Sequence, residues 1–127
     1  MPLRRLYRIA RPRLWSFPIN RYVPESPITV SAPWYEKLFA KPPVRRPMPG
    51  LVEWQFSDSA EVQLFEAPEH AGHGTLTLGV MPIGPEHARL AAAGLAPGEI
   101  EQTEGYFTLR LFDPDGNLIV LASAERG

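Results

Sequence analysis

Apolar and polar residues alternate with a period of two along several stretches of the chain, which is the pattern of half-buried β-strands. Thr75 to Val80 places its threonines on one face and its leucines on the other. Tyr106 to Phe112 alternates in the same way, with Phe107, Leu109 and Leu111 on one side. Both stretches are therefore predicted to be strands with one face packed against a core.

The remaining elements follow from shorter signals. Apolar runs predict further strands at residues 19–23, 51–56, 61–66 and 118–121. Residues 41–50, which are rich in proline, are predicted to wrap the surface or to form a short edge strand, and a short strand is predicted at 100–103. Trp34, Tyr35, Leu38 and Phe39 have helical spacing, so a helix is expected over 31–40, with Ser31 as its N-cap. A second helix is expected to open at Pro85 and to end at Gly94.

A compact turn joins the last two apolar runs. Its sequence is Asp113-Pro114-Asp115-Gly116-Asn117. Proline pre-sets φ for a turn, aspartate side chains bind their own backbone, and glycine accepts a positive φ. The stretch therefore predicts a β-hairpin that closes at Gly116.

The order strand, helix, short strand and hairpin occurs twice. Aligning Trp34 with Arg89, or Phe56 with Phe112, gives offsets of 55 and 56 residues. This predicts an internal duplication of βαβββ modules, and hence an α+β fold. Each helix would cover one sheet face, and the other faces would form a curved mixed sheet around a cleft.

Length and composition limit the alternatives. The chain of 127 residues has the size of one domain, with no apolar run of the roughly 20 residues that span a bilayer. It has no cysteine, which excludes disulfides, thiolate zinc sites and iron–sulfur clusters. Any metal would need histidine or carboxylate ligands. No secretory signal is recognised, and a cytoplasmic location is expected.

Five arginines crowd the first fourteen residues and leave the remainder acidic. Residues 1–16 are therefore predicted to be a poorly ordered basic arm. Nucleic-acid binding is the less favoured alternative, because no structured reader lies beside the arm, and an organellar leader stays open. The domain is predicted at 17–124, with one module at 17–68 and the other at 74–124.

The closing hairpin, a strand followed by Asp113-Pro114-Asp115-Gly116-Asn117 and a second strand, resembles that of the vicinal oxygen chelate superfamily. This superfamily groups glyoxalase I, extradiol dioxygenases, fosfomycin-resistance transferases and bleomycin-resistance binding proteins. The resemblance implies paired βαβββ modules around a site, and it covers about residues 17–124. Homodimers are usual in the family, so a homodimer is expected here.

The enzymes of this superfamily hold a divalent metal with histidine and glutamate from the first and last strands of each module. The resemblance places the ligand positions at Asn20, Gln63, Thr75 and Val120. Amides and hydroxyls are weak ligands and valine is none, so no bound cofactor is expected and a divalent metal is disfavoured. A register shift of two residues, which would turn His73 toward the cleft, is the open alternative. Glu69, His70 and His73 have a zinc-like spacing, but the glycines beside them favour a solvated loop.

The strand faces turned away from the helices are predicted to form the ligand pocket. They comprise Asn20, Tyr22, Gln63, Thr75, Thr77, Tyr106, Thr108, Arg110, Leu118 and Val120. Arg110 must pair with a carboxylate, reach solvent or bind an anion, and pairing with Glu61 or Glu53 is favoured.

This surface suits a small aromatic or anionic organic molecule. The first hypothesis is a metal-free binding protein of the bleomycin-resistance type. The alternative is a lyase, isomerase or dioxygenase that uses a non-standard metal site or metal-free acid–base catalysis. Neither a membrane nor a nucleic acid is expected as a partner.

Overall fold

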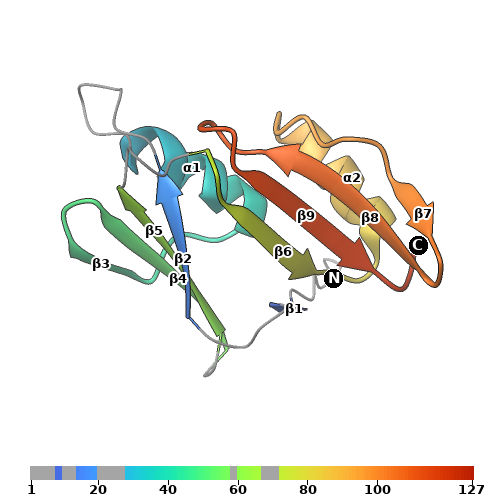
Figure 1. Ribbon diagram of the computed structural model, residues 1–127, viewed down its shortest axis with the longest axis horizontal. Coiled ribbons are helices and arrows are strands. Elements are labelled where there is room, and N and C mark those ends of the chain that lie inside the picture. The colour runs from blue at the N-terminus through green and yellow to red at the C-terminus, as the bar shows by residue number, and fades with distance from the viewer. Residues whose placement is uncertain (1–7, 10–13, 20–27, 58–59, 67–71) are drawn as a thin grey trace.

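The computed structural model describes residues 8–9, 14–19, 28–57, 60–66 and 72–127, and it divides them into two modules (Figure 1). The first module contains β2 (Leu14–Ile19), α1 (Ile28–Phe39), β3 (Arg45–Met48), β4 (Leu51–Ser57) and β5 (Ala60–Glu66). The second contains β6 (Thr75–Gly79), α2 (Ile83–Ala92), β7 (Glu101–Thr103), β8 (Tyr106–Phe112) and β9 (Leu118–Ser123). A two-residue strand, β1 (Arg8–Ile9), precedes both.

The two modules have the same sheet topology. The strand order is β2-β5-β4-β3 in the first sheet and β6-β9-β8-β7 in the second, where β1 is added beside β6. In each module the first strand runs parallel to the last, and the hairpin strands are antiparallel. The predicted duplication of βαβββ modules is thus confirmed. The two sheets lie side by side as separate hydrogen-bonded units (Figure 1).

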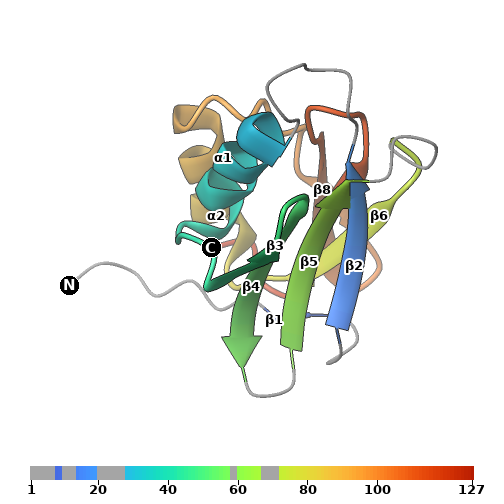
Figure 2. The ribbon, with the colours of Figure 1, turned by 90° about the vertical axis from the view of Figure 1, so that its left-hand side faces the viewer.

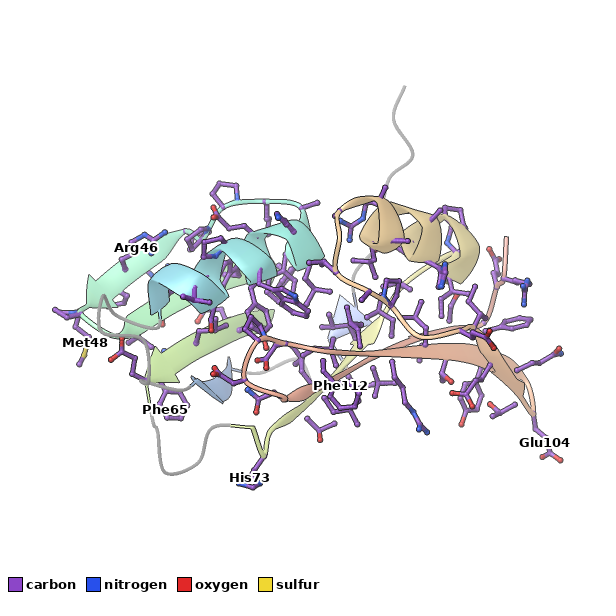
Figure 3. The ribbon with its side chains drawn as sticks, turned by 90° about the horizontal axis from the view of Figure 1, so that it is seen from above. Arg46, Met48, Phe65, His73, Glu104 and Phe112 are labelled. Carbon is purple, nitrogen blue, oxygen red and sulfur yellow. The ribbon has the colours of Figure 1, made fainter. Side chains whose placement is uncertain are left out.

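Both helices cover the same side of the two sheets (Figures 2 and 3). On that side, the rings of Tyr35 and Phe39 of α1 pack at a tilt against Trp54 of β4, with ring centroids 6.3 and 5.3 Å from that of Trp54. The buried residues of the two modules form one continuous cluster. Such continuity ties the two modules together, because neither helix face could be exposed without opening the shared core.

The alternation along the strands of the second module is confirmed. Leu76, Leu78, Leu109, Leu111, Ile119 and Leu121 are all buried. The residues between them are exposed or half-buried. Because alternate residues of a strand point to opposite faces, these intervening residues lie on the side away from the helices.

The first strand and the first helix begin earlier than predicted. β2 spans Leu14–Ile19, whereas the predicted strand was 19–23, of which residues 20–23 fall outside the described residues; β2 contains Pro18. Proline is tolerated there because β2 lies at the edge of its sheet. The helix α1 begins at Ile28, so Ser31 is not its N-cap; the buried Ser31 hydroxyl instead lies 3.5 Å from a carboxylate oxygen of Asp115.

The second helix begins at Ile83 and not at Pro85, because the C-terminal tail supplies its first partners. The backbone N–H groups of Ile83 and Gly84 donate to the carbonyls of Glu125 and Arg126, at 3.0 and 2.6 Å. At the other end, Gly94 has φ of 79° and ends the helix as predicted. Among the described residues, no helix is long and apolar enough to cross a membrane.

Candidate functional site

Seven of the predicted pocket residues lie together on the side of the second module's sheet that the helices leave uncovered. We call this surface the open face; its residues are Thr75, Thr77, Tyr106, Thr108, Arg110, Phe112, Leu118 and Val120. The strand register brings Val120 directly beside both Thr77 and Arg110, and Leu118 beside Thr75. Of the other three, Gln63 lies on β5 of the first module, and Asn20 and Tyr22 fall outside the described residues.

The turn at the end of β8 fixes the register of this face. The carboxylate of Asp113 accepts hydrogen bonds from the backbone N–H groups of Asp115 and Asn117, at 2.9 and 2.8 Å, and from the Asn117 amide at 2.8 Å. Gly116 has φ of 90°, as the turn chemistry predicts. The side-chain amide oxygen of Asn117 also accepts from the backbone N–H of Gly74 at 2.8 Å, which aligns the start of β6 with β9.

A hydrogen bond from α1 ties the first module to this turn. The hydroxyl of Tyr35, which is completely buried, donates to Asp113 over 2.7 Å. Burial, followed by the charge of Asp113, raises the pKa of Tyr35 well above its ordinary value. The phenol is therefore neutral at physiological pH and acts as a donor that positions the turn.

On the corresponding surface of the first module, the charged side chains form ion pairs and hydrogen bonds with one another. Glu53, only 7 % exposed, accepts hydrogen bonds from the Gln63 amide and from Arg45 Nε, the latter at 2.7 Å. Arg45 also forms an ion pair with Glu61. The Gln63 amide, and then the Arg45 guanidinium, lower the pKa of Glu53. Both oxygens of the Glu53 carboxylate are therefore engaged within the protein.

The predicted ion pair of Arg110 with Glu53 or Glu61 is wrong. Both carboxylates bind Arg45, which reaches them from the neighbouring edge strand β3. Arg110 is exposed and has no ion-pair partner among the residues that the structure describes. Arg45 prevails because its backbone pairs directly with that of Glu53, so its side chain starts on the same face.

Two residues of this region were absent from the predicted pocket. Phe112 is 62 % exposed and projects on the side away from the helices (Figure 3). Its place follows from parity, since it lies two residues beyond Arg110 on the same strand. Glu53 also could have been included, because the hairpin register pairs it with Gln63.

The positions implied for a metal do not offer a suitable donor set. Gln63 is hydrogen-bonded to Glu53, Thr75 offers only a hydroxyl, and Val120 has no donor atom. The register places Thr77, rather than Thr75, opposite Val120. Within the described part of the chain, no group of three or more histidine and acidic residues could hold a metal ion.

The two histidines within the described residues lie apart from each other. His73 is exposed and precedes β6 (Figure 3), and His87 is half-buried on α2. Glu69 and His70 fall outside the described residues. A separate surface hollow of about 420 Å³ lies at the outer edge of the first module, lined by residues 46–52. None of the predicted pocket residues lines it.

Comparison with known proteins gives structural likeness alone. No family model matches the sequence, and no curated protein matches it. The chain resembles a glyoxalase/bleomycin resistance protein of Catenulispora acidiphila, with a TM-score of 0.74 and 22 % identity over 87 % of this chain and 95 % of the other.

Two further solved structures share this architecture. TnmS3, an antibiotic-binding protein from a Streptomyces species, gives a TM-score of 0.72 and 20 % identity, covering 87 % of this chain and 93 % of that one. A lactoylglutathione lyase from Agrobacterium tumefaciens gives 0.70 and 13 %, covering 87 % and 91 %. Together with the duplicated modules and the closing hairpin, these likenesses show that the chain has the fold of the vicinal oxygen chelate superfamily.

Proposed function

We propose that this protein binds a small organic molecule on its open face and that it does so without a catalytic metal. One observation carries the proposal: the exposed guanidinium of Arg110 has no ion-pair partner among the described residues, and it lies among threonines and apolar side chains. Hydrogen-bonding groups placed beside apolar side chains are typical of small-molecule sites.

The likeness to an antibiotic-binding protein supports the binding function. Fold alone does not determine function, so the argument depends on the residues of the face. Thr75 and Thr77 offer hydroxyls, while Leu118 and Val120 offer apolar area beside them. This combination favours recognition over chemistry, because none of the eight side chains of the open face carries an imidazole or a carboxylate that could act as a general base.

An enzyme is the second candidate, and the likeness to a lactoylglutathione lyase favours it. Its acid–base group on the first module would be Glu53, next to Gln63. However, the hydrogen bonds of Gln63 and Arg45 lower the pKa of Glu53, which makes this carboxylate a weak base. We therefore place the enzyme second.

A ligand screen tests the binding function. The full chain is screened against small organic molecules by thermal shift, since a ligand that binds only the folded state raises Tm. Methyl resonances then locate each hit. We expect shifts at Thr75, Thr77 and Val120 but not at Leu76 or Leu78 behind the sheet. Hits that perturb only other surfaces, or a complete lack of hits, would contradict the proposal.

Light scattering of the purified protein measures its molar mass and so tests the predicted homodimer. Elemental analysis of the same sample tests the metal-free state. Protein purified without chelator should contain no stoichiometric transition metal, because the implied ligand positions lack imidazole and carboxylate groups. One tightly bound metal per chain, lost on chelation together with an activity, would instead establish the enzyme.

A further inference from the structure

We infer that the ligand of the open face is an aromatic carboxylate, with its anionic group on Arg110 and its ring on Phe112. This inference rests on the proposed function and specifies its ligand. It follows from two properties of β8 that the fold does not require: a cation without an internal partner and an exposed aromatic ring two residues further on.

The charge of the ligand follows from comparing the two modules. Glu53 and Gln63 are cross-strand partners in the first module, and Arg110 and Val120 are the partners 57 residues later in the second. In the first module, Arg45 neutralises Glu53 from within the chain. In the second module, the positive charge of Arg110 has no carboxylate partner among the described residues. A bound anion would form with Arg110 the kind of ion pair that Arg45 forms with Glu53.

The chemical form of the anion follows from the guanidinium. An arginine side chain presents a planar fork of N–H donors, which matches the two oxygens of a carboxylate. Glu101 is the acidic neighbour on this face, but it pairs with Thr108 across the strands and forms no ion pair with Arg110. The threonine hydroxyls nearby can donate a further hydrogen bond to the same group.

The ring of the ligand follows from Phe112. This side chain is 62 % exposed, although burial of an aromatic ring is strongly favourable. Arg110 and Phe112 are two residues apart on one strand, so their Cα atoms are about 7 Å from each other. A flat molecule one or two rings long can therefore cover Phe112 while its carboxylate reaches Arg110.

Three probe molecules distinguish the contribution of the ligand's negative charge to affinity from that of its aromatic ring. We would titrate the full chain with 2-naphthoate, with 2-naphthamide, which lacks the charge, and with cyclohexanecarboxylate, which lacks the aromatic ring. Calorimetry should show that 2-naphthoate binds at least tenfold more tightly than either analogue. Arg110→Gln should lower its affinity about tenfold or more, Arg110→Lys should lower it less, and Phe112→Leu should lower it about fivefold.

Matched controls are available on the first module. Arg46→Gln removes an exposed charge on β3, and Phe65→Leu makes the same ring change on β5 (Figure 3). Both should leave the affinity unchanged within about twofold. Circular dichroism and Tm of each variant confirm that it is folded, and all these side chains are at least partly exposed.

Several outcomes would overturn this inference. If 2-naphthamide binds as tightly as 2-naphthoate and shifts the same methyl groups, the face binds ligands but does not select an anion. If Phe112→Leu dissociates a dimer and leaves 2-naphthoate binding intact, a second copy of the chain covers the ring. If 2-naphthoate does not bind while other hits shift Thr77 and Val120, the proposed function stands and this ligand class fails.

Discussion

At the scale of single residues, Asp113 connects the two modules. Its carboxylate holds the turn through the backbone of Asp115 and Asn117, and it accepts the Tyr35 hydroxyl from the opposite module. The residue is 5 % exposed, so each of these hydrogen bonds replaces water that the carboxylate has lost. The turn that joins the two open-face strands β8 and β9 is therefore held partly by the Tyr35 hydroxyl of α1.

Tyr35→Phe should destabilise the protein by about 1 to 2 kcal/mol, because it removes one donor from a buried carboxylate. The matched control is Tyr106→Phe on the exposed end of β8, which should change the free energy of unfolding by less than about 0.5 kcal/mol. Urea denaturation measures both. Equal stability of Tyr35→Phe and the wild type would show that the hydrogen bond to Asp113 contributes nothing.

The same tyrosine predicts a dependence on alkaline pH. Since burial and Asp113 raise the pKa of Tyr35 above its ordinary value of 10.0, the folded state keeps a proton that the unfolded state loses. Stability is therefore fully present below about pH 10 and falls as the pH rises toward the folded pKa. Tyr35→Phe should show a shallower fall above pH 10, which denaturation at several pH values can measure.

The partner of a charged residue was the least predictable feature at this scale. From the sequence, Glu53 and Glu61 were the predicted ion-pair partners of Arg110. Only the pairing of β3 with β4 shows that Arg45 is closer to both carboxylates. Edge strands of four residues carry little pattern, since all of β3 is exposed. By contrast, the side that Arg110 faces was predictable, because strand parity fixes it.

At the scale of elements, the hairpin of β8 and β9 was predicted almost completely. Its turn uses residues whose local chemistry determines the conformation, and its strands alternate without interruption. The starts of the helices were missed for the opposite reason. The first N–H groups of α2 bind carbonyls of the C-terminal tail about 40 residues away, and the Ser31 hydroxyl is used across the module boundary. No local pattern contains such long-range partners.

Gly116→Val should cost on the order of 1 kcal/mol or more, because φ at this position is 90°. A Cβ added there would meet nothing within 4 Å, so the cost comes from the backbone conformation and not from a clash. Gly116→Asn provides the control, since asparagine adopts positive φ more readily, and it should cost less. Denaturation midpoints that are the same for both variants and the wild type would contradict this account.

Substitutions in β9 test which face is open. Val120→Glu places a carboxylate beside Arg110 on the open face and should cost no more than about 1 to 2 kcal/mol. Ile119→Glu and Leu121→Glu place the same group among fully buried side chains and should cost several kcal/mol. Chemical denaturation compares the three. Equal destabilisation of Val120→Glu and Ile119→Glu would mean that the face beside Arg110 is filled.

At the scale of the whole molecule, the two modules are joined at the middle of α1 and near its C-terminal end. The turn at Asp113 binds the side chain of Tyr35, and Arg89 of α2 donates to the carbonyls of Lys37 and Leu38 at 2.6 and 2.7 Å. The same guanidinium binds Glu86, which is 2 % exposed, with both contacts at 3.0 Å. A cation at a helix C-terminus also interacts favourably with the helix dipole.

Arg89→Met should therefore lower the free energy of unfolding by about 2 to 3 kcal/mol, because it removes charge-assisted hydrogen bonds between the modules while retaining an apolar stem. The control Arg46→Met changes an exposed arginine on β3 and should have little effect. Since the core is one cluster, urea denaturation of Arg89→Met should still follow a single transition. Two separate transitions would show that Arg89, and not the shared core, makes the modules unfold together.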